Sequence, residues 1–230
     1  MTGGSDRDWD SFDAYLFDVD GTLLNCRDAV HYFAFCDTLH MLAGRPLNLD
    51  GVQAHGNTDT GILRDALRLA GLKDEEWRHR LPEAYEAMAA HVQRNLADMQ
   101  VDAAPFALEV LQHLRRRGAL VGVATGNLEA IGRLKLERTG LLGCFDFGGY
   151  SDGLETRSDV FGAALSQAKR LAGSQAAVCV VGDTPADILA ARANGLAVIA
   201  VATGVFRREQ LAEHAPDLLI ESFQDLPGLS

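Results

Sequence analysis

The sequence has few basic residues relative to acidic ones, and this shortage argues against several kinds of partner. Lysine and arginine total 21 while aspartate and glutamate total 32, which gives a formal net charge of −11 at pH 7. A chain of this charge is not expected to be held on nucleic acid or on an anionic membrane by its mean field. A small anionic substrate stays possible, because a few focused cations or a metal ion can override that mean.

Other absences narrow the class further. No apolar run approaches the roughly 20 residues that a membrane span needs, so no membrane partner is expected. The first residues, MTGGSDRDWDSFD, are polar and acidic and lack the apolar core of a secretory signal, which predicts a cytoplasmic protein. The four cysteines have neither Cys-x-x-Cys pairs nor Cys/His ligand spacing, which argues against structural zinc and favours reduced thiols: Cys26, Cys36, Cys144 and Cys179.

What the chain does contain indicates a parallel α/β sheet. Its 230 residues suit one domain, or one domain that carries an insertion. Four short apolar runs, rich in β-branched or aromatic residues, suit strands buried on both faces: residues 14–17, 119–124, 176–181 and 197–201. Helical patterns lie between them at 128–138, 159–171 and 185–194, and a further helix ends at Gly118. This alternation predicts a doubly wound fold.

The interval 25–103 breaks that alternation. It has no strand-like run, and its helical patterns cover 27–43, 59–70 and 74–96, the last with Pro82 as a boundary or kink. We therefore expect an inserted helical domain at 25–103, and a sheet domain made of 1–24 plus 104–230.

Polar residues follow three of the four apolar runs. The first run leads into Asp18-Val-Asp20-Gly, the second into Thr125-Gly-Asn, and the third into Gly-Asp183-Thr-Pro-Ala-Asp187. Each string alone is better explained as a turn or a helix cap than as part of a site. Because the carboxyl ends of parallel strands share one edge of a sheet, all three together predict a common site. Carboxylates gathered there repel one another and need a cation, and their hard oxygens suit Mg²⁺.

The strings FDVDGTLL, VATGN and VVGDTPADI resemble the first, second and fourth motifs of the haloacid dehalogenase superfamily. The helical insertion resembles the C1 cap of that family, whose core is Rossmann-like. The resemblance implies that Asp18 is the nucleophile, forming an aspartyl-phosphate, and that Asp20 is the general acid and base. It implies a Mg²⁺ site made of Asp18, the backbone carbonyl of Asp20 and Asp183, with Asp187 supporting it. It also implies phosphate binding by Thr125, Gly126 and Asn127.

The third motif of the family, usually a lysine, departs from the pattern here. The corresponding stretch offers Arg157 as the cation at the start of its helix, and we expect Arg157 to bind phosphate. Lys135 is the reserve candidate, although a solvated helix face is the stronger expectation for it. In the cap, Asn57 and Thr58 resemble a loop that meets substrate, with the alternative that Thr58 or Asp59 caps a helix. The cap histidines, including His31, are expected in packing or at the surface.

These features predict a Mg²⁺-dependent phosphatase acting on a small phosphorylated metabolite, similar to phosphoglycolate phosphatases. The presence of Asp20 disfavours the dehalogenase and phosphonatase branches, whose chemistry protonates no phosphoester oxygen. A mutase similar to β-phosphoglucomutase shares the same core residues and remains an alternative, as does a non-catalytic phospho-acceptor module. A monomer and a homodimer fit the sequence equally.

Overall fold

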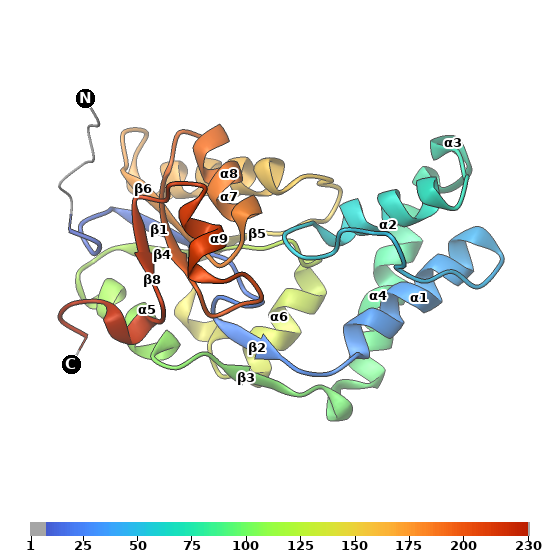
Figure 1. The fold of residues 1–230 in the computed structure, drawn as a ribbon, viewed down its shortest axis with the longest axis horizontal. Helices are drawn as coiled ribbons and strands as arrows, with labels where there is room; N and C mark the ends of the chain where they lie inside the picture. The colour runs from blue at the N-terminus through green and yellow to red at the C-terminus, as the bar shows by residue number, and fades with distance from the viewer. Residues whose placement is uncertain (1–7, 230) are drawn as a thin grey trace.

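The computed structural model describes residues 8–229, and the larger of its two parts is built around a six-stranded sheet (Figure 1). All its strands are parallel, in the order β5-β4-β1-β6-β7-β8. They are β1 (Ala14–Phe17), β4 (Leu120–Ala124), β5 (Phe147–Gly149), β6 (Val178–Gly182), β7 (Ala197–Val201) and β8 (Leu218–Ile220). Strands β4 and β5 lie on one side of β1, and β6, β7 and β8 lie on the other side, so the strand order reverses at β1. Such switch points are where open α/β sheets bind ligands.

Successive residues of β1 face opposite layers of helices, which explains why its sequence is apolar throughout. Tyr15 and Phe17 pack with Val110 of α5, whereas Leu16 packs with Phe161 of α7. All four residues of the strand are fully buried. The helices of this part are α5 (Ala107–Arg116), α6 (Glu129–Arg138), α7 (Arg157–Ala172), α8 (Pro185–Ala193) and α9 (Arg208–Ala212).

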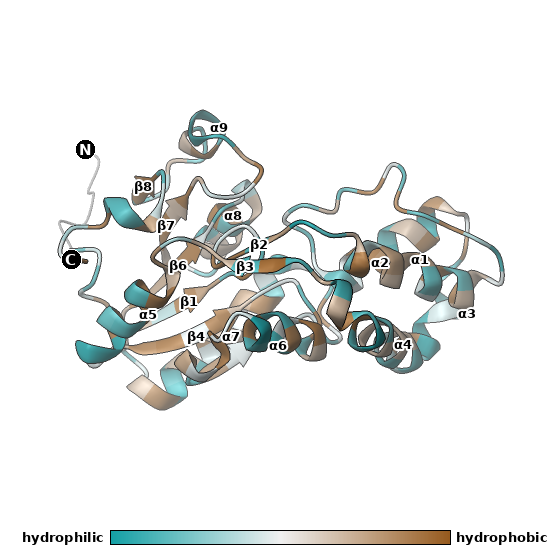
Figure 2. Cartoon of the chain, turned by 90° about the horizontal axis from the view of Figure 1, so that it is seen from below, coloured by the Kyte–Doolittle hydropathy of each residue, from teal (hydrophilic) through white to brown (hydrophobic). Residues whose placement is uncertain are grey.

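A helical cap lies to one side of the sheet (Figure 1). It comprises α1 (Val30–Ala43), α2 (Asp59–Leu69), α3 (Asp74–Trp77) and α4 (Leu81–Arg94), and its own apolar cluster includes Trp77 and Met88. The antiparallel strands β2 (Leu24–Cys26) and β3 (Val101–Ala103) join it to the sheet. Figure 2 shows hydrophobic residues along the sheet strands and hydrophilic residues on the outer sides of the helices. Ile131 of α6 also packs into the cap cluster, so the two parts share a contact.

The expectation that 25–103 contains no strand was wrong at both ends of the interval. Strands β2 and β3 are three residues each, partly exposed, and defined by long-range pairing such as Leu24 with Ala103. The edge strands β5 and β8 were also not predicted, because three residues are too few for a local pattern. The segment 74–96 divides into α3, a short 3-10 turn and α4, which begins at Leu81 with Pro82 in its first turn.

Among the described residues, no helix has the length and apolar character that crossing a membrane would require.

Candidate active site

The carboxyl ends of β1, β4 and β6 meet beside the cap, and their polar residues surround one cavity of about 450 Å³. Asp18 and Asp20 follow β1, Thr125 follows β4 and Asp183 follows β6. The structure therefore brings the three sequence strings together, as the parallel-sheet argument predicted. Cap residues form the opposite wall of the cavity.

Asp18 lies at the base of this site and is 3% exposed. Its Oδ1 is 2.8 Å from Nη2 of Arg157. Burial raises the pKa of Asp18 to about 7, although the charge of Arg157 acts in the opposite direction. Asp18 is thus a carboxylate that depends on neighbouring cations to remain charged at neutral pH.

Arg157 occupies the first turn of α7, where the Thr156 side chain caps the helix. Its residue is 9% exposed, so it is a buried cation rather than a surface arginine. Nε donates a hydrogen bond of 2.7 Å to Oδ1 of Asp187, and Nη2 contacts Asp18. A Cβ placed on Gly126 would lie 2.9 Å from Nη1, so the remaining arm of the guanidinium faces the loop after β4.

Three carboxylates could hold a metal ion in this structure. Single oxygen atoms of Asp18, Asp183 and Asp187 all lie within 4.8 Å of one another. Burial and the charges of Asp18 and Asp187 keep the pKa of Asp183 well above its usual value. A divalent cation would offset this repulsion, and carboxylate oxygens are the donors that Mg²⁺ prefers. The Asp183 carboxylate packs closely on Gly21, where φ is +85° and a Cβ would collide with it.

Asp187 is already committed to protein contacts. Its Oδ1 accepts from Arg157, and its Oδ2 accepts from the backbone N–H and the hydroxyl of Thr184 at 3.0 and 2.8 Å. These bonds suit a residue that orients the site rather than one that contributes a free ligand atom. The Asp20 carboxylate does not belong to this group and is bonded to Asn127 and Lys135, so Asp20 would serve a metal through its backbone carbonyl.

The two oxygens of the Asp20 carboxylate differ sharply. Oδ2 accepts hydrogen bonds from Asn127 Nδ2 at 2.7 Å and from Lys135 Nζ at 2.8 Å. Oδ1 is buried and has no hydrogen-bond partner within residues 8–229. Burial would raise the pKa of Asp20, but the Lys135 charge and these hydrogen bonds outweigh it and lower the pKa. One oxygen is therefore held in place by Asn127 and Lys135, while the other is buried with its hydrogen-bonding capacity unused.

Lys135 corrects one expectation from the sequence. It does not lie on a solvated helix face, because its residue is only 2% exposed. Nζ donates to Asp20, to Asn127 Oδ1 at 2.8 Å and to His31 Nδ1 at 3.2 Å. A signal was present: Lys135 stands four residues after the buried Ile131, hence on the buried face of α6.

The loop after β4 has a free hydroxyl proton. Thr125 Oγ1 accepts from Asn127 Nδ2 at 2.8 Å, which leaves its own O–H able to donate to a ligand. The hydroxyl and the adjacent Gly126 line the cavity on the side of Asp18.

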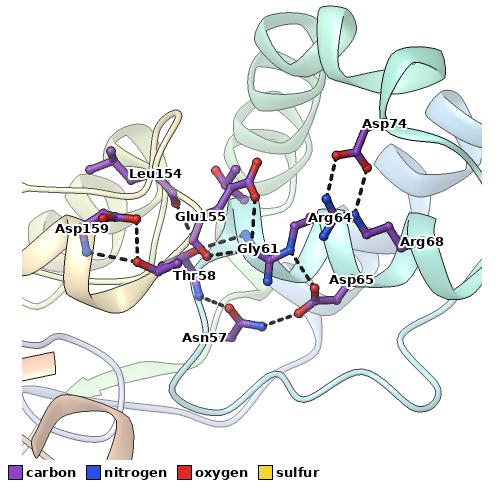
Figure 3. Close-up of polar contacts among 12 residues, drawn as sticks. Asn57, Thr58, Gly61, Arg64, Asp65, Arg68, Asp74, Leu154, Glu155 and Asp159 are labelled. Carbon is purple, nitrogen blue, oxygen red and sulfur yellow. Dashed lines mark hydrogen bonds and ion pairs between the residues drawn. The ribbon is translucent and has the colours of Figure 1, made fainter. Parts of the chain in front are cut away.

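The cap loop at 57–58 divides between the two expected roles. Thr58 caps α2, since its hydroxyl accepts from Gly61 N–H at 2.9 Å and donates to the Leu154 carbonyl at 3.1 Å (Figure 3). Asn57 lines the cavity, with its side chain held by Thr58 N–H and Asp65. The helix-capping interpretation of Thr58 is thus confirmed, whereas a substrate contact by Asn57 remains a prediction.

Ion pairs fasten the cap to the sheet part near the start of α7 (Figure 3). Glu155, which immediately precedes the Thr156 cap residue, pairs with Arg64 of α2 at 3.1 Å and also with Arg78. A second link lies inside the cavity, where the Asp59 carboxylate accepts from Leu128 N–H at 2.8 Å. The sequence did not predict these pairs, because their members lie far apart along the chain.

Comparison with known proteins agrees with this geometry. Residues 12–195 match the haloacid dehalogenase-like hydrolase family, so the chain belongs to that family and is a hydrolase. The expected family and fold class, a Rossmann-like parallel sheet with helices, are confirmed.

The similar curated proteins have names that describe phosphatases. The chain is 29% identical over 223 residues to a phosphoglycolate phosphatase of Synechococcus elongatus, covering 93% of this chain and 94% of that protein. It is 30% identical over 124 residues to the protein named "Probable phosphatase IndB" of Dickeya dadantii. The aligned region covers 54% of this chain and 54% of that protein. The crystal structure of CbbY from Rhodobacter sphaeroides in complex with phosphate has the same fold, with a TM-score of 0.67 at 20% identity over 94% of this chain and 96% of that one.

Proposed function

We propose that this protein is a Mg²⁺-dependent phosphatase that hydrolyses small phosphomonoesters through an aspartyl-phosphate on Asp18. The observation that carries the proposal is that Asp18, beside the Arg157 cation, lines the same cavity as Asp20, whose carboxylate is fixed by Asn127 and Lys135. The similarity to phosphoglycolate phosphatase supports substrates of that size.

In the first half of the reaction, a carboxylate oxygen of Asp18 attacks phosphorus and the bond from phosphorus to the alcohol oxygen breaks. Asp20 transfers a proton from its carboxyl group to the departing alcohol oxygen. Three donors bind the phosphoryl oxygens and stabilise the negative charge on them in the transition state: the hydroxyl of Thr125, the N–H of Gly126 and the Nη1 group of Arg157. The leaving alcohol then departs toward the cap.

In the second half, Asp20 accepts a proton from water, and that water attacks phosphorus to release phosphate and restore Asp18. The lowered pKa of Asp20 favours the carboxylate form that this step needs and disfavours the protonated form that the first half needs. Mg²⁺, when held by Asp18, the Asp20 carbonyl and Asp183, would neutralise charge on the phosphoryl oxygens. We expect the cap at 25–103 to open and close around the substrate, with hinges near residues 24–25 and 103–104.

The test is phosphate release from a panel of phosphomonoesters, with and without Mg²⁺. We expect Mg²⁺-dependent release by the unmodified protein, loss of release in Asp18→Asn, and no change in Asp50→Asn, which alters an exposed aspartate of the cap. Release that persists in Asp18→Asn would contradict the proposal. Transfer of the phosphoryl group to a sugar hydroxyl instead of water would indicate the mutase alternative.

A further inference from the structure

The cavity has two walls of different chemistry. Asp18, Thr125, Gly126 and Arg157 form the wall at the sheet, where the proposed function places the phosphoryl group. The opposite wall comes from the cap, and the alcohol part of a substrate must lie against it, since the leaving oxygen points away from Asp18 in an in-line attack. The charge of the cap wall therefore determines which alcohols the site accepts.

Lys135 offers no free donor to the alcohol part. A lysine ammonium has three N–H groups, and here Asp20, Asn127 and His31 each accept one. With the residue only 2% exposed, the ammonium is enclosed by these partners. A substrate carboxylate could reach Lys135 only by displacing one of them.

Arg157 is committed to the phosphoryl side. Its Nε and Nη2 contact Asp187 and Asp18, and its third nitrogen faces Gly126 in the loop after β4. No other lysine or arginine of residues 8–229 lines the cavity. The cap wall therefore lacks a cation of this type for a second anionic group.

The histidines do not replace it. Because the Lys135 ammonium can only donate, Nδ1 of His31 accepts from it. Nε2 of the same ring makes no hydrogen bond within residues 8–229, but it lies 3.2 Å from the Asp59 carboxylate, which is the anion nearest to it. His55 also lines the cavity but lies exposed at its rim, where water screens its interactions.

The cap wall instead presents carboxylates, the amides of Asn25 and Asn57, and aromatic and aliphatic side chains. Asp28 and Asp59 both line it, and His31 stacks on Phe35 with ring centroids 4.9 Å apart. Ile62 adds an apolar surface beside them. Both oxygens of Asp28 and Oδ2 of Asp59 accept from backbone N–H groups, which does not remove their negative charge. A second carboxylate or phosphate on the substrate would face these two negative groups with no unpaired lysine or arginine, whereas a hydroxyl group could donate to a remaining lone pair of either carboxylate.

We propose that the substrate is a phosphomonoester of an uncharged alcohol, such as a polyol or a sugar, and that hydroxy-acid phosphates and bisphosphates are disfavoured. This inference rests on the proposed function and specifies its substrate class. It makes the charge of the alcohol part, rather than its size, the property that the cap wall selects.

A matched pair of substrates tests it: 2-phosphoglycolate and 2-hydroxyethyl phosphate, which differ in a carboxylate against a hydroxymethyl group. With the Mg²⁺-loaded protein, we expect kcat/KM for 2-hydroxyethyl phosphate to exceed that for 2-phosphoglycolate by at least about tenfold, since like charges in contact are strongly unfavourable. A smaller ratio, or a preference for 2-phosphoglycolate, would overturn the inference and leave the phosphatase proposal standing. Failure to release phosphate from either ester and from p-nitrophenyl phosphate would overturn both.

A charge variant tests the electrostatic cause separately. Val205 lines the cavity and is 61% exposed, so substitution there should not disturb folding. We expect Val205→Lys to lower the substrate ratio by about threefold or more by supplying a cation at the mouth, whereas the uncharged Val205→Gln leaves it unchanged. An unchanged ratio in Val205→Lys, with activity on 2-hydroxyethyl phosphate retained, would overturn the inference.

Discussion

Replacing Lys135 by methionine should separate proton transfer from the rest of the reaction. The substitution keeps an unbranched side chain of similar length but removes the ammonium that donates to Asp20 Oδ2 at 2.8 Å. The Lys135 side chain is 2% exposed and that of Asp20 is 37% exposed. Of the two partners of Asp20 Oδ2, Asn127 then remains, so the Asp20 carboxylate is less firmly positioned for proton transfer.

The expected cost to stability is small enough to leave a folded protein. A hydrogen bond to a charged group contributes about 1.5–3 kcal/mol, and partial exposure of Asp20 places this one near the lower end. The bonds to Asn127 and His31 are lost as well, so the total cost is about 3–5 kcal/mol, which is tolerable when native domains have free energies of unfolding of about 5–15 kcal/mol. General acid–base catalysis contributes about 10²–10⁴-fold, so a displaced Asp20 should lower kcat for an alkyl ester about 100-fold. That factor corresponds to about 2.7 kcal/mol of transition-state stabilisation.

The assay compares two leaving groups. We expect kcat of Lys135→Met for 2-hydroxyethyl phosphate to fall about 100-fold, while kcat for acetyl phosphate falls less than about fivefold, because acetate leaves without needing a proton. In an Asp20→Asn background, Lys135→Met should cost less than about threefold more, since both changes act on one step. Lys169→Met, on the exposed side of α7, is the matched control. Equal falls for the two substrates would refute the positioning role of Lys135.

Three other predictions concern separate parts of the site. Arg157→Ala should lower kcat by at least about 100-fold by removing charge stabilisation, and a fall under about threefold in steady-state assays would contradict its role. Asp183→Asn should weaken Mg²⁺ binding by about tenfold or more in calorimetric titration, and an unchanged affinity would exclude Asp183 as a ligand. Glu155→Gln removes the ion pairs with Arg64 and Arg78, each worth about 1 kcal/mol at most, so KM should rise about two- to fivefold while kcat stays nearly constant. Glu137→Gln, an exposed change on α6, should alter neither constant, and a tenfold or larger fall in kcat for Glu155→Gln would place Glu155 in the chemistry instead.

The four inner strands and the helices around them could be predicted because their signals are local. Strands β1 and β7 have the expected bounds, since both are apolar throughout and covered on both faces. Helix α8 begins at Pro185, behind a Thr184 cap, as its first residues indicate. The convergence of Asp18, Thr125 and Asp183 followed from a geometric rule, that parallel strands end at one edge. For these features the neighbours along the chain carry the necessary information.

The remaining features depend on contacts between distant residues. Strands β2 and β3 form because Leu24 pairs with Ala103, although the whole cap segment separates these two residues in the sequence. Neither strand is apolar enough to be recognised from its own residues. Lys135 was expected in solvent because lysine is seldom buried, but Asp20 is 115 residues away and supplies the charge that makes burial tolerable. Local patterns thus determine which residues can react. Packing within the sheet part determines how those residues are paired, and the docking of the cap determines which charges a substrate meets.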